Sequence, residues 1–107
     1  MVSPESRGIK QGNETLFSIA EMDSQTPFCD LHGMHPNKAI QECEKFIDQE
    51  FTKGTEVIRI IHGRGSGKLR EKIHELLKSN ELVKDFRDSQ KPSEMLGATI
   101  AILEERY

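Results

Sequence analysis

One short segment of the sequence combines two residue types that can carry out acid–base chemistry. Asp30 and His32 are two residues apart, and on a strand the side chains at that spacing project from the same face. An imidazole titrates near neutral pH and a neighbouring carboxylate can orient it, so both residues are candidate catalytic residues. The alternative is structural, with Asp30 as an acceptor in a loop and His32 as a turn residue.

A second segment, His62-Gly63-Arg64-Gly65-Ser66-Gly67-Lys68-Leu69-Arg70, has the composition of a phosphate-binding loop. Its three alternating glycines permit positive φ angles and let the backbone approach a ligand closely. The first turn of the helix expected after it has free N–H groups, and the helix dipole favours an anion there. The segment therefore predicts a phosphate cradle. Its expected substrate-binding residues are His62, Gly63, Arg64, Gly65, Gly67, Lys68 and Arg70.

Two common nucleotide-binding motifs do not fit this glycine loop. A P-loop has a glycine five residues before its Gly-Lys pair and Ser or Thr after the lysine, where this sequence has His62 and Leu69. A G-x-G-x-x-G fingerprint fails because its third glycine would fall on Arg70 or Lys68. The chain is also too short for a complete doubly wound nucleotide-binding domain. We therefore expect the loop to bind the phosphate of a polymer.

Charge is distributed unevenly along the chain. The formal net charge is −3, which argues against a protein that is basic throughout and binds nucleic acid over its whole surface. The interval 59–72 nevertheless carries a net positive charge, and the remainder is correspondingly acidic. A small basic island on an acidic body indicates one localised anion site. The basic residues of this island are Arg59, Arg64, Lys68, Arg70 and Lys72.

Hydrophobic patterns predict the elements that position these residues. Apolar residues at spacings of three and four predict a helix from Pro36 to about Phe51, and Gly54 suits the left-handed position after its end. A nearly continuous β-branched run at 57–61 predicts a central strand. Further strands are expected at 28–32, 82–87 and 96–103, and a second helix at 69–79.

The resulting order, β-α-β-α-β-β, predicts a two-layer α/β sandwich. Each crossover through one helix implies parallel strands and a right-handed connection, which puts two helices on one face if the strands are added in one direction. The short link between the last two strands makes them antiparallel neighbours, so the four-stranded sheet is mixed. Ligands bind at the C-terminal ends of parallel strands, where Asp30, His32 and His62 would converge on the glycine loop.

Length and composition set further expectations. The 107 residues suit one domain, which we assign to residues 28–107, and residues 1–27 are expected to form a largely flexible N-terminal extension. No apolar run approaches the about 20 residues of a membrane span. We therefore expect no membrane partner. Cys29 and Cys43 are too few for a disulfide scaffold, which indicates a reduced, cytoplasmic protein.

These segments resemble the motifs of a known family. Cys29-Asp30-Leu31-His32-Gly33 is similar to the L-D-L-H-G motif of the Smr (small MutS-related) domain, and segment 62–70 is similar to its H-G-x-G-x-G-x-L-R motif at every defined position. Gly97-Ala98-Thr99 resembles the G-A-T before its last strand. The resemblance implies an α/β sandwich like the C-terminal domain of translation initiation factor three. It also implies nicking or cleaving endonuclease activity on DNA or RNA.

At the positions that match the family motifs, the resemblance implies that Asp30 and His32 are catalytic. It also implies that His62 and the glycines at 63, 65 and 67 form the substrate loop. Several family members are linked to mRNA cleavage at stalled ribosomes. The expected function is therefore an endonuclease that favours RNA, with an RNA or DNA backbone and the ribosome as candidate partners. The family usually has a Gly-Gly pair before Gly97, where this chain has Ser93-Glu94-Met95-Leu96. A non-catalytic module that binds nucleic acid or the ribosome thus remains the alternative.

No cofactor is expected. A divalent metal held by Asp30, His32, His35 and His62 is an alternative, although no pair among them has the spacing of a common metal motif. RNA cleavage needs no metal if the substrate's own 2′-OH is the nucleophile, whereas DNA cleavage needs an activated water. His74 is expected to lie on a helix surface without a function.

Overall fold

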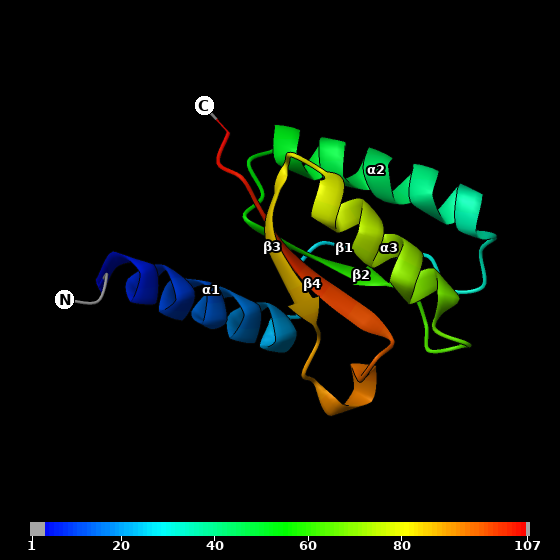
Figure 1. Ribbon diagram of the computed structural model, residues 1–107, viewed down its shortest axis with the longest axis horizontal. Coiled ribbons are helices and arrows are strands. Elements are labelled where there is room, and N and C mark those ends of the chain that lie inside the picture. Colours follow the sequence, from blue (N-terminus) through cyan, green and yellow to red (C-terminus); the bar gives the residue numbers. More distant parts are fainter. Residues whose placement is uncertain (1–3, 107) are drawn as a thin grey trace.

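The fold alternates strands and helices before a final pair of strands (Figure 1). The computed structural model describes the backbone of residues 4–106 and the side chains of residues 13–106. Each element predicted from the hydrophobic pattern is present, with ends that agree to within two residues. No helix within residues 4–106 is long and apolar enough to cross a membrane. The elements are α1 (Pro4–Met22), β1 (Phe28–Asp30), α2 (Pro36–Thr52), β2 (Val57–Ile61), α3 (Lys68–Ser79), β3 (Val83–Asp88), the 3₁₀ turn η1 (Pro92–Glu94) and β4 (Ala98–Leu103).

The strands form one mixed sheet in the order β1-β2-β4-β3. The parallel pairing of β1 with β2 and the antiparallel pairing of β3 with β4 confirm the predictions. The strands joined by helical crossovers, β1, β2 and β3, follow one direction across the sheet, but β2 and β3 are not paired, because β4 lies between them and is antiparallel to both. All six residues of β4 are buried, whereas β3 carries charges and is only partly buried. The more apolar strand takes the central place, and the charged strand forms the edge.

Helices α2 and α3 cover one face of the sheet, as predicted (Figure 1). Residues at alternate positions of the two central strands point into this layer, which follows from the period of two along a strand. A fully buried Ile or Leu contributes about 1.5–3 kcal/mol relative to an exposed one, so this layer is the main core. Its fully buried aliphatic residues include Ile47, Ile58, Ile60, Ile73, Leu77 and Leu103.

Helix α1 packs against the opposite face of the sheet (Figure 1). Phe17 and Ala20 are buried there against Ile100 and Ile102 of β4. No element was predicted from the unclear hydrophobic period of residues 16–22, and this helix adds a third layer to the predicted two-layer sandwich. The flexibility expected for residues 1–27 stays a prediction. The physical reason for the third layer is that β4 is apolar on both faces, and both must be covered.

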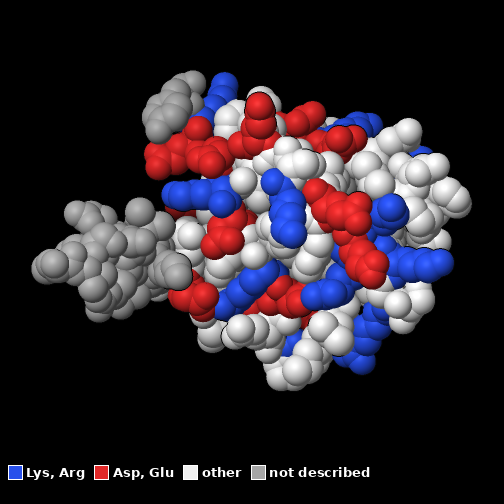
Figure 2. Space-filling view, in the orientation of Figure 1, with Lys and Arg blue, Asp and Glu red and all other residues white. Residues whose placement is uncertain are grey.

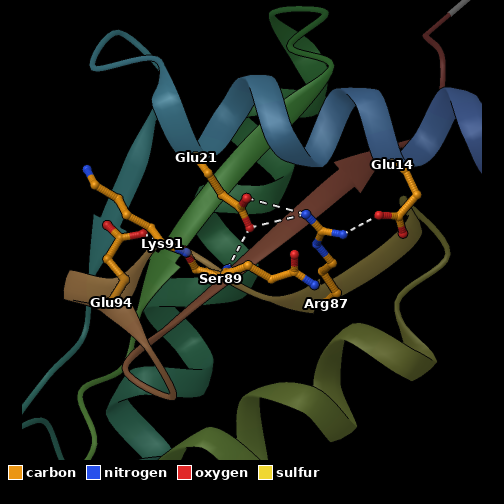
Figure 3. A network of polar contacts seen from close by, with 7 residues as sticks. Glu14, Glu21, Arg87, Ser89, Lys91 and Glu94 are labelled. Carbon is orange, nitrogen blue, oxygen red and sulfur yellow. Dashed lines mark hydrogen bonds and ion pairs between the residues drawn. The ribbon is translucent and has the colours of Figure 1, made fainter.

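Ion pairs also hold α1 on this face (Figure 3). Arg87 of β3 pairs with Glu14 and Glu21 and lies over the ring of Phe17, 4.7 Å from its centroid. Glu21 also accepts the backbone N–H of Gln90 at 2.7 Å. Because Arg87 and Glu21 are largely withdrawn from solvent, water screens this pair less than an exposed one. The network joins α1 to the segment that leads from β3 toward β4.

Candidate active site

A cleft of about 420 Å³ lies where β1 and β2 end. Two segments line the cleft. The segment after β1 contributes His32, Gly33, Met34 and Pro36, and the segment after β2 contributes residues 62–69. The structure thus places His32 against the glycine loop, as the sequence predicted from parallel strands. Of the expected site residues, the cleft brings together His32, His62, Gly63, Arg64, Gly65, Gly67 and Lys68.

Asp30 and His32 form a hydrogen-bonded pair at the rim of this cleft. The Nδ1 atom of His32 lies 2.5 Å from Oδ1 of Asp30, and the backbone N–H of His32 donates to the same oxygen at 3.1 Å. The bond from the ring holds the pKa of Asp30 below its usual value. An ionised carboxylate only accepts, so Nδ1 carries the proton and Nε2 is the ring's basic atom. The His32 side chain is 68% exposed, which leaves this atom accessible.

The end of β1 determines where these two side chains point. Leu31 between them is fully buried in the core, and its N–H donates to the carbonyl of Ile61 on β2 at 2.7 Å. Alternation along the chain then turns Asp30 and His32 outward together. His35 serves a different purpose, because its Nδ1 accepts the backbone N–H of Asn37 and caps α2.

Gly63 is the point of closest approach between the two segments. Its φ is +79°, and a Cβ atom there would lie 3.1 Å from Cβ of His32. Glycine is therefore required both for the backbone conformation and for the contact. The N–H groups of His62 and Gly63 both donate to the carbonyl of Gly97, at 3.0 and 2.9 Å. The start of β4 thus fixes the base of the glycine loop.

The rest of the loop presents unpaired amides. Among the hydrogen bonds within residues 4–106, none uses the N–H of Arg64, Gly65 or Ser66. Helix α3 begins after Gly67, whose φ of 89° is left-handed and which offers no side chain to cap the helix. The positive end of the helix dipole and these N–H groups suit an anion, and Lys68 adds charge at the cleft.

His62 and Arg70, two of the expected substrate-binding residues, bind partners inside the protein. His62 is 3% exposed, with Nδ1 at 3.0 Å from the carbonyl of Gly63 and Nε2 at 2.9 Å from the hydroxyl of Thr99. Arg70 binds both carboxylate oxygens of Asp88, at 2.8 and 2.5 Å, and is not among the residues that line the cleft. The structure therefore does not bring Arg70 to the expected site, and both ring nitrogens of His62 bind inside the protein.

Comparison with known protein families agrees with this geometry. The family model of the Smr domain matches residues 29–104, which is most of the chain and includes both segments of the cleft. The chain belongs to the Smr domain family.

Curated relatives of this Smr domain are much longer proteins. It is 42% identical over 74 residues to "Endonuclease MutS2" of Aquifex aeolicus, which covers 69% of this chain and 10% of that protein. A relative of the same name from Caldanaerobacter subterraneus is 35% identical over 102 residues, covering 95% of this chain and 13% of the relative. The chain thus spans about a tenth of the length of these relatives.

Solved Smr domain structures share the fold. The Smr domain of Thermus thermophilus MutS2 superimposes with a TM-score of 0.72 at 28% identity, covering 74% of this chain and 99% of that one. YdaL, a stand-alone small MutS-related protein from Escherichia coli, gives a TM-score of 0.67 at 20% identity and covers 76% of this chain and 66% of its own. The latter likeness concerns the fold alone.

The structure gives polar partners to three residues of this Smr domain that were assigned no role from the sequence, although Thr99 belongs to the G-A-T segment. Thr99 on β4 is fully buried and places its hydroxyl between the rings of His62 and His74. His74, which was expected on a helix surface, is instead half-buried, and its Nε2 lies 2.8 Å from that hydroxyl and 3.5 Å from Asp88. Arg70 holds the pKa of Asp88 below its usual value through the hydrogen bonds it donates.

The metal ligand set considered from the sequence is not assembled. Within the described part of the chain, the one group of three metal-ligating residues is His62, His74 and Asp88, whose ligand atoms lie within 4.8 Å of one another. These residues could hold a metal ion only after rearrangement. The hydroxyl of Thr99 already binds both Nε2 atoms, and Arg70 binds both oxygens of Asp88.

Some residues of the basic island line the cleft, whereas Arg59 is buried and stabilises the fold. Basic side chains gather at the edge of the molecule that carries the loop after β2, whereas acids dominate near the C-terminus (Figure 2). Arg59 belongs to the fold: it is 9% exposed, its Nη1 lies 3.2 Å from Oε2 of Glu94, and it lies over the ring of Phe28. Arg64 and Lys68 are the cations that line the cleft.

Proposed function

We propose that this Smr domain is an endonuclease that cleaves RNA without a metal cofactor. One observation carries the proposal: a hydrogen-bonded Asp30–His32 pair, with an accessible imidazole, lies across a cleft from a loop of unpaired amides. The name "Endonuclease MutS2" of its relatives supports the reaction class. A phosphodiester in the cleft would meet an acid–base group on one side and anion-binding groups on the other.

In the proposed mechanism, His32 acts as the general base and Asp30 keeps the ring oriented. Nε2 of His32 removes the proton of the substrate 2′-OH, and the 2′ oxygen attacks the phosphorus. Asp30 accepts from Nδ1 and stabilises the imidazolium that forms. The bond from phosphorus to the 5′ oxygen breaks, and the leaving oxygen takes a proton from solvent. The products are a 2′,3′-cyclic phosphate and a 5′-OH.

The glycine loop stabilises the charge that develops during this step. The unpaired N–H groups of residues 64–66 are fixed in place before the substrate arrives, and such donors are worth more than mobile ones. Arg64 and Lys68 add positive charge on the same side. The loop therefore supplies both binding energy and stabilisation of the transition state.

The donor set at the cleft supports the metal-free route. None of the described residues that line the cleft is an aspartate or a glutamate, and Mg²⁺ is held mainly through carboxylates. Asp30 at the rim already binds His32 through one oxygen. The substrate's own 2′-OH makes an activated water unnecessary on RNA, whereas DNA lacks that group.

The proposal is tested with an RNA oligonucleotide and a copy that carries a 2′-deoxy nucleotide at the cut site, both incubated in EDTA. We expect cleavage of the RNA to a 2′,3′-cyclic phosphate and no cleavage of the deoxy copy. Cleavage of the deoxy copy, or cleavage of either only after Mg²⁺ or Mn²⁺ is added, would contradict the metal-free mechanism.

The alternative is a module that binds nucleic acid without cutting it. The exposure of the pair favours it, because water competes for His32 in an open cleft. Binding of both oligonucleotides with no product under any metal condition would establish the binding module. Both functions use the same cleft, so the chemical outcome separates them.

A further inference from the structure

Beneath the glycine loop lies a hydrogen-bond chain that the proposed mechanism does not use. It runs from His74 on α3 through Thr99 on β4 to His62 and ends at the carbonyl of Gly63. We propose that His74 and Thr99 are positioning residues: this hydrogen-bond chain fixes His62 with its proton on Nδ1 and so orients the Gly63–Arg64 peptide toward the phosphate. The consequence for cleavage rests on the proposed function, whereas the proton positions do not.

The proton of His62 follows from its partners. A carbonyl oxygen only accepts, so Nδ1 at 3.0 Å from the carbonyl of Gly63 must carry a proton. Burial holds the pKa of His62 below its usual value, which favours the neutral form of the ring. A neutral ring has one proton, which leaves Nε2 as an acceptor.

The hydroxyl of Thr99 determines which nitrogen of His74 carries a proton. Its single proton is donated to Nε2 of His62 at 2.9 Å, so its oxygen must accept from Nε2–H of His74 at 2.8 Å. Asp88 lies 3.5 Å from the same nitrogen and favours a proton there. Burial also holds the pKa of His74 below its usual value, and its ring packs edge-on against Phe86 at 5.0 Å. Each proton in the chain is thereby assigned.

The chain acts on the loop through the geometry of one peptide. The carbonyl of Gly63 and the N–H of Arg64 belong to the same planar unit and point in opposite directions. Because His62 holds the carbonyl on the buried side, the N–H of Arg64 faces away from it. That N–H has no partner within residues 4–106, so it is free for an oxygen of the substrate.

Proton positions are measured by long-range ¹H–¹⁵N correlation of the histidine rings in the ¹⁵N-labelled chain at pH 7. We expect neutral His62 with its proton on Nδ1 and neutral His74 with its proton on Nε2. A metal bound through the Nε2 atoms of His62 and His74 would require both of these atoms to be bare. A proton on Nε2 of His62, or a bare Nε2 on His74, with or without added Zn²⁺, would overturn the proposal.

The positioning role is tested by two substitutions of one residue. Thr99→Val keeps the shape but removes the hydroxyl, and Thr99→Ser keeps the hydroxyl. We expect Thr99→Val to shift the amide signals of Arg64 and Gly65 and to lower kcat about tenfold or more with little change in KM, and Thr99→Ser to restore both within about twofold.

The readouts separate this proposal from the proposed function. A folded Thr99→Val variant with wild-type loop signals and wild-type kcat would overturn the positioning role. If the wild-type chain cuts no nucleic acid, the proposed function fails, while the ring protons and the loop signals still decide whether the hydrogen-bond chain orients the loop.

Discussion

Two clusters of polar residues contact Gly63: His32 of one lies against its Cα position, and His62 of the other binds its carbonyl. The proposed catalytic pair, Asp30 and His32, is exposed to solvent. In the hydrogen-bond chain, His62 and Thr99 are buried and His74 at its end is half-buried. An exposed imidazole can exchange its proton with a bound substrate, but a buried one that binds through both nitrogens holds its proton in place. Under the two proposals, burial and hydrogen-bond partners, more than residue type, therefore decide which histidine reacts and which one positions the loop.

The largest effect expected is on the catalytic pair. His32→Ala should lower the rate of RNA cleavage by about 10²–10⁴-fold because it removes the proposed base. Its exposed side chain contributes little packing, so the free energy of unfolding should change by less than about 0.5 kcal/mol. The control is His35→Asn, three residues away, which keeps a side chain able to cap α2. A folded His32→Ala variant that cuts at the wild-type rate would remove His32 from the mechanism.

The next effect concerns Gly63, where the two clusters meet. Gly63→Ala should destabilise the fold by about 1–2 kcal/mol because of its left-handed φ, and should also slow cleavage about 10–100-fold by displacing His32. Gly54→Ala is the matched control, since its φ is +82° and nothing lies within 4 Å of the added Cβ. Denaturant unfolding should show that both variants are destabilised. Cleavage assays should show a slower rate only for Gly63→Ala. Equal cleavage by both would mean that the contact with His32 is unimportant.

A smaller effect is expected on binding. Arg64→Ala and Lys68→Ala should each weaken RNA binding and reduce the slope of log K against log salt by about one unit or less, as for a lost phosphate contact. Lys72→Ala removes the same charge from an exposed position outside the cleft. Binding titrations at several salt concentrations should leave this control close to the wild type. Equal slopes for all three variants would indicate diffuse attraction by the whole basic island.

The smallest effect is on acid stability, and it compares the carboxylates beside the two clusters. The pKa values of Asp30 and Asp88 are both lowered in the folded chain. Such a carboxyl contributes stability above its unfolded pKa and loses that stability as the pH falls through its folded pKa. The free energy of unfolding should therefore fall below about pH 4. Asp88→Asn should flatten this fall more than Asp30→Asn, because solvent screens the exposed Asp30. Parallel curves for the wild type and Asp88→Asn would contradict the assignment.

The hydrophobic pattern was sufficient to predict the elements but not their order in the sheet. Hydrophobic repeats of two residues in strands and of three to four in helices depend only on residues close in the sequence. They predicted the strands β1 to β4 and the helices α2 and α3. The order depends on which strand is the more apolar, and the contrast between Ala98–Leu103 and Val83–Asp88 was present in the sequence. Helix α1 was not predicted, because residues 16–22 are apolar without a clear period and the residues before them are mostly polar.

The candidate site was predicted only where its residues are close in the sequence. Asp30 and His32, and the glycines of the loop, are short local patterns that two parallel strands bring together. Thr99 is 37 residues from His62 and 25 from His74, so no spacing rule connects them. Arg70 was assigned to the loop for its charge, and its actual partner Asp88 lies 18 residues further along the chain. Such contacts depend on the strand order, which the pattern did not provide.

The contact between Gly63 and His32 bears on any attempt to move this site to another protein. The first atom of a side chain at position 63 would press on His32 at 3.1 Å, so the glycine loop has its shape only above this strand end. Grafting segment 62–70 alone would transfer the cations and the glycines without the surface against which they are formed. The transplantable unit is the parallel pair β1–β2 with both of its outgoing loops, together with the carbonyl of Gly97 that holds the base of the glycine loop.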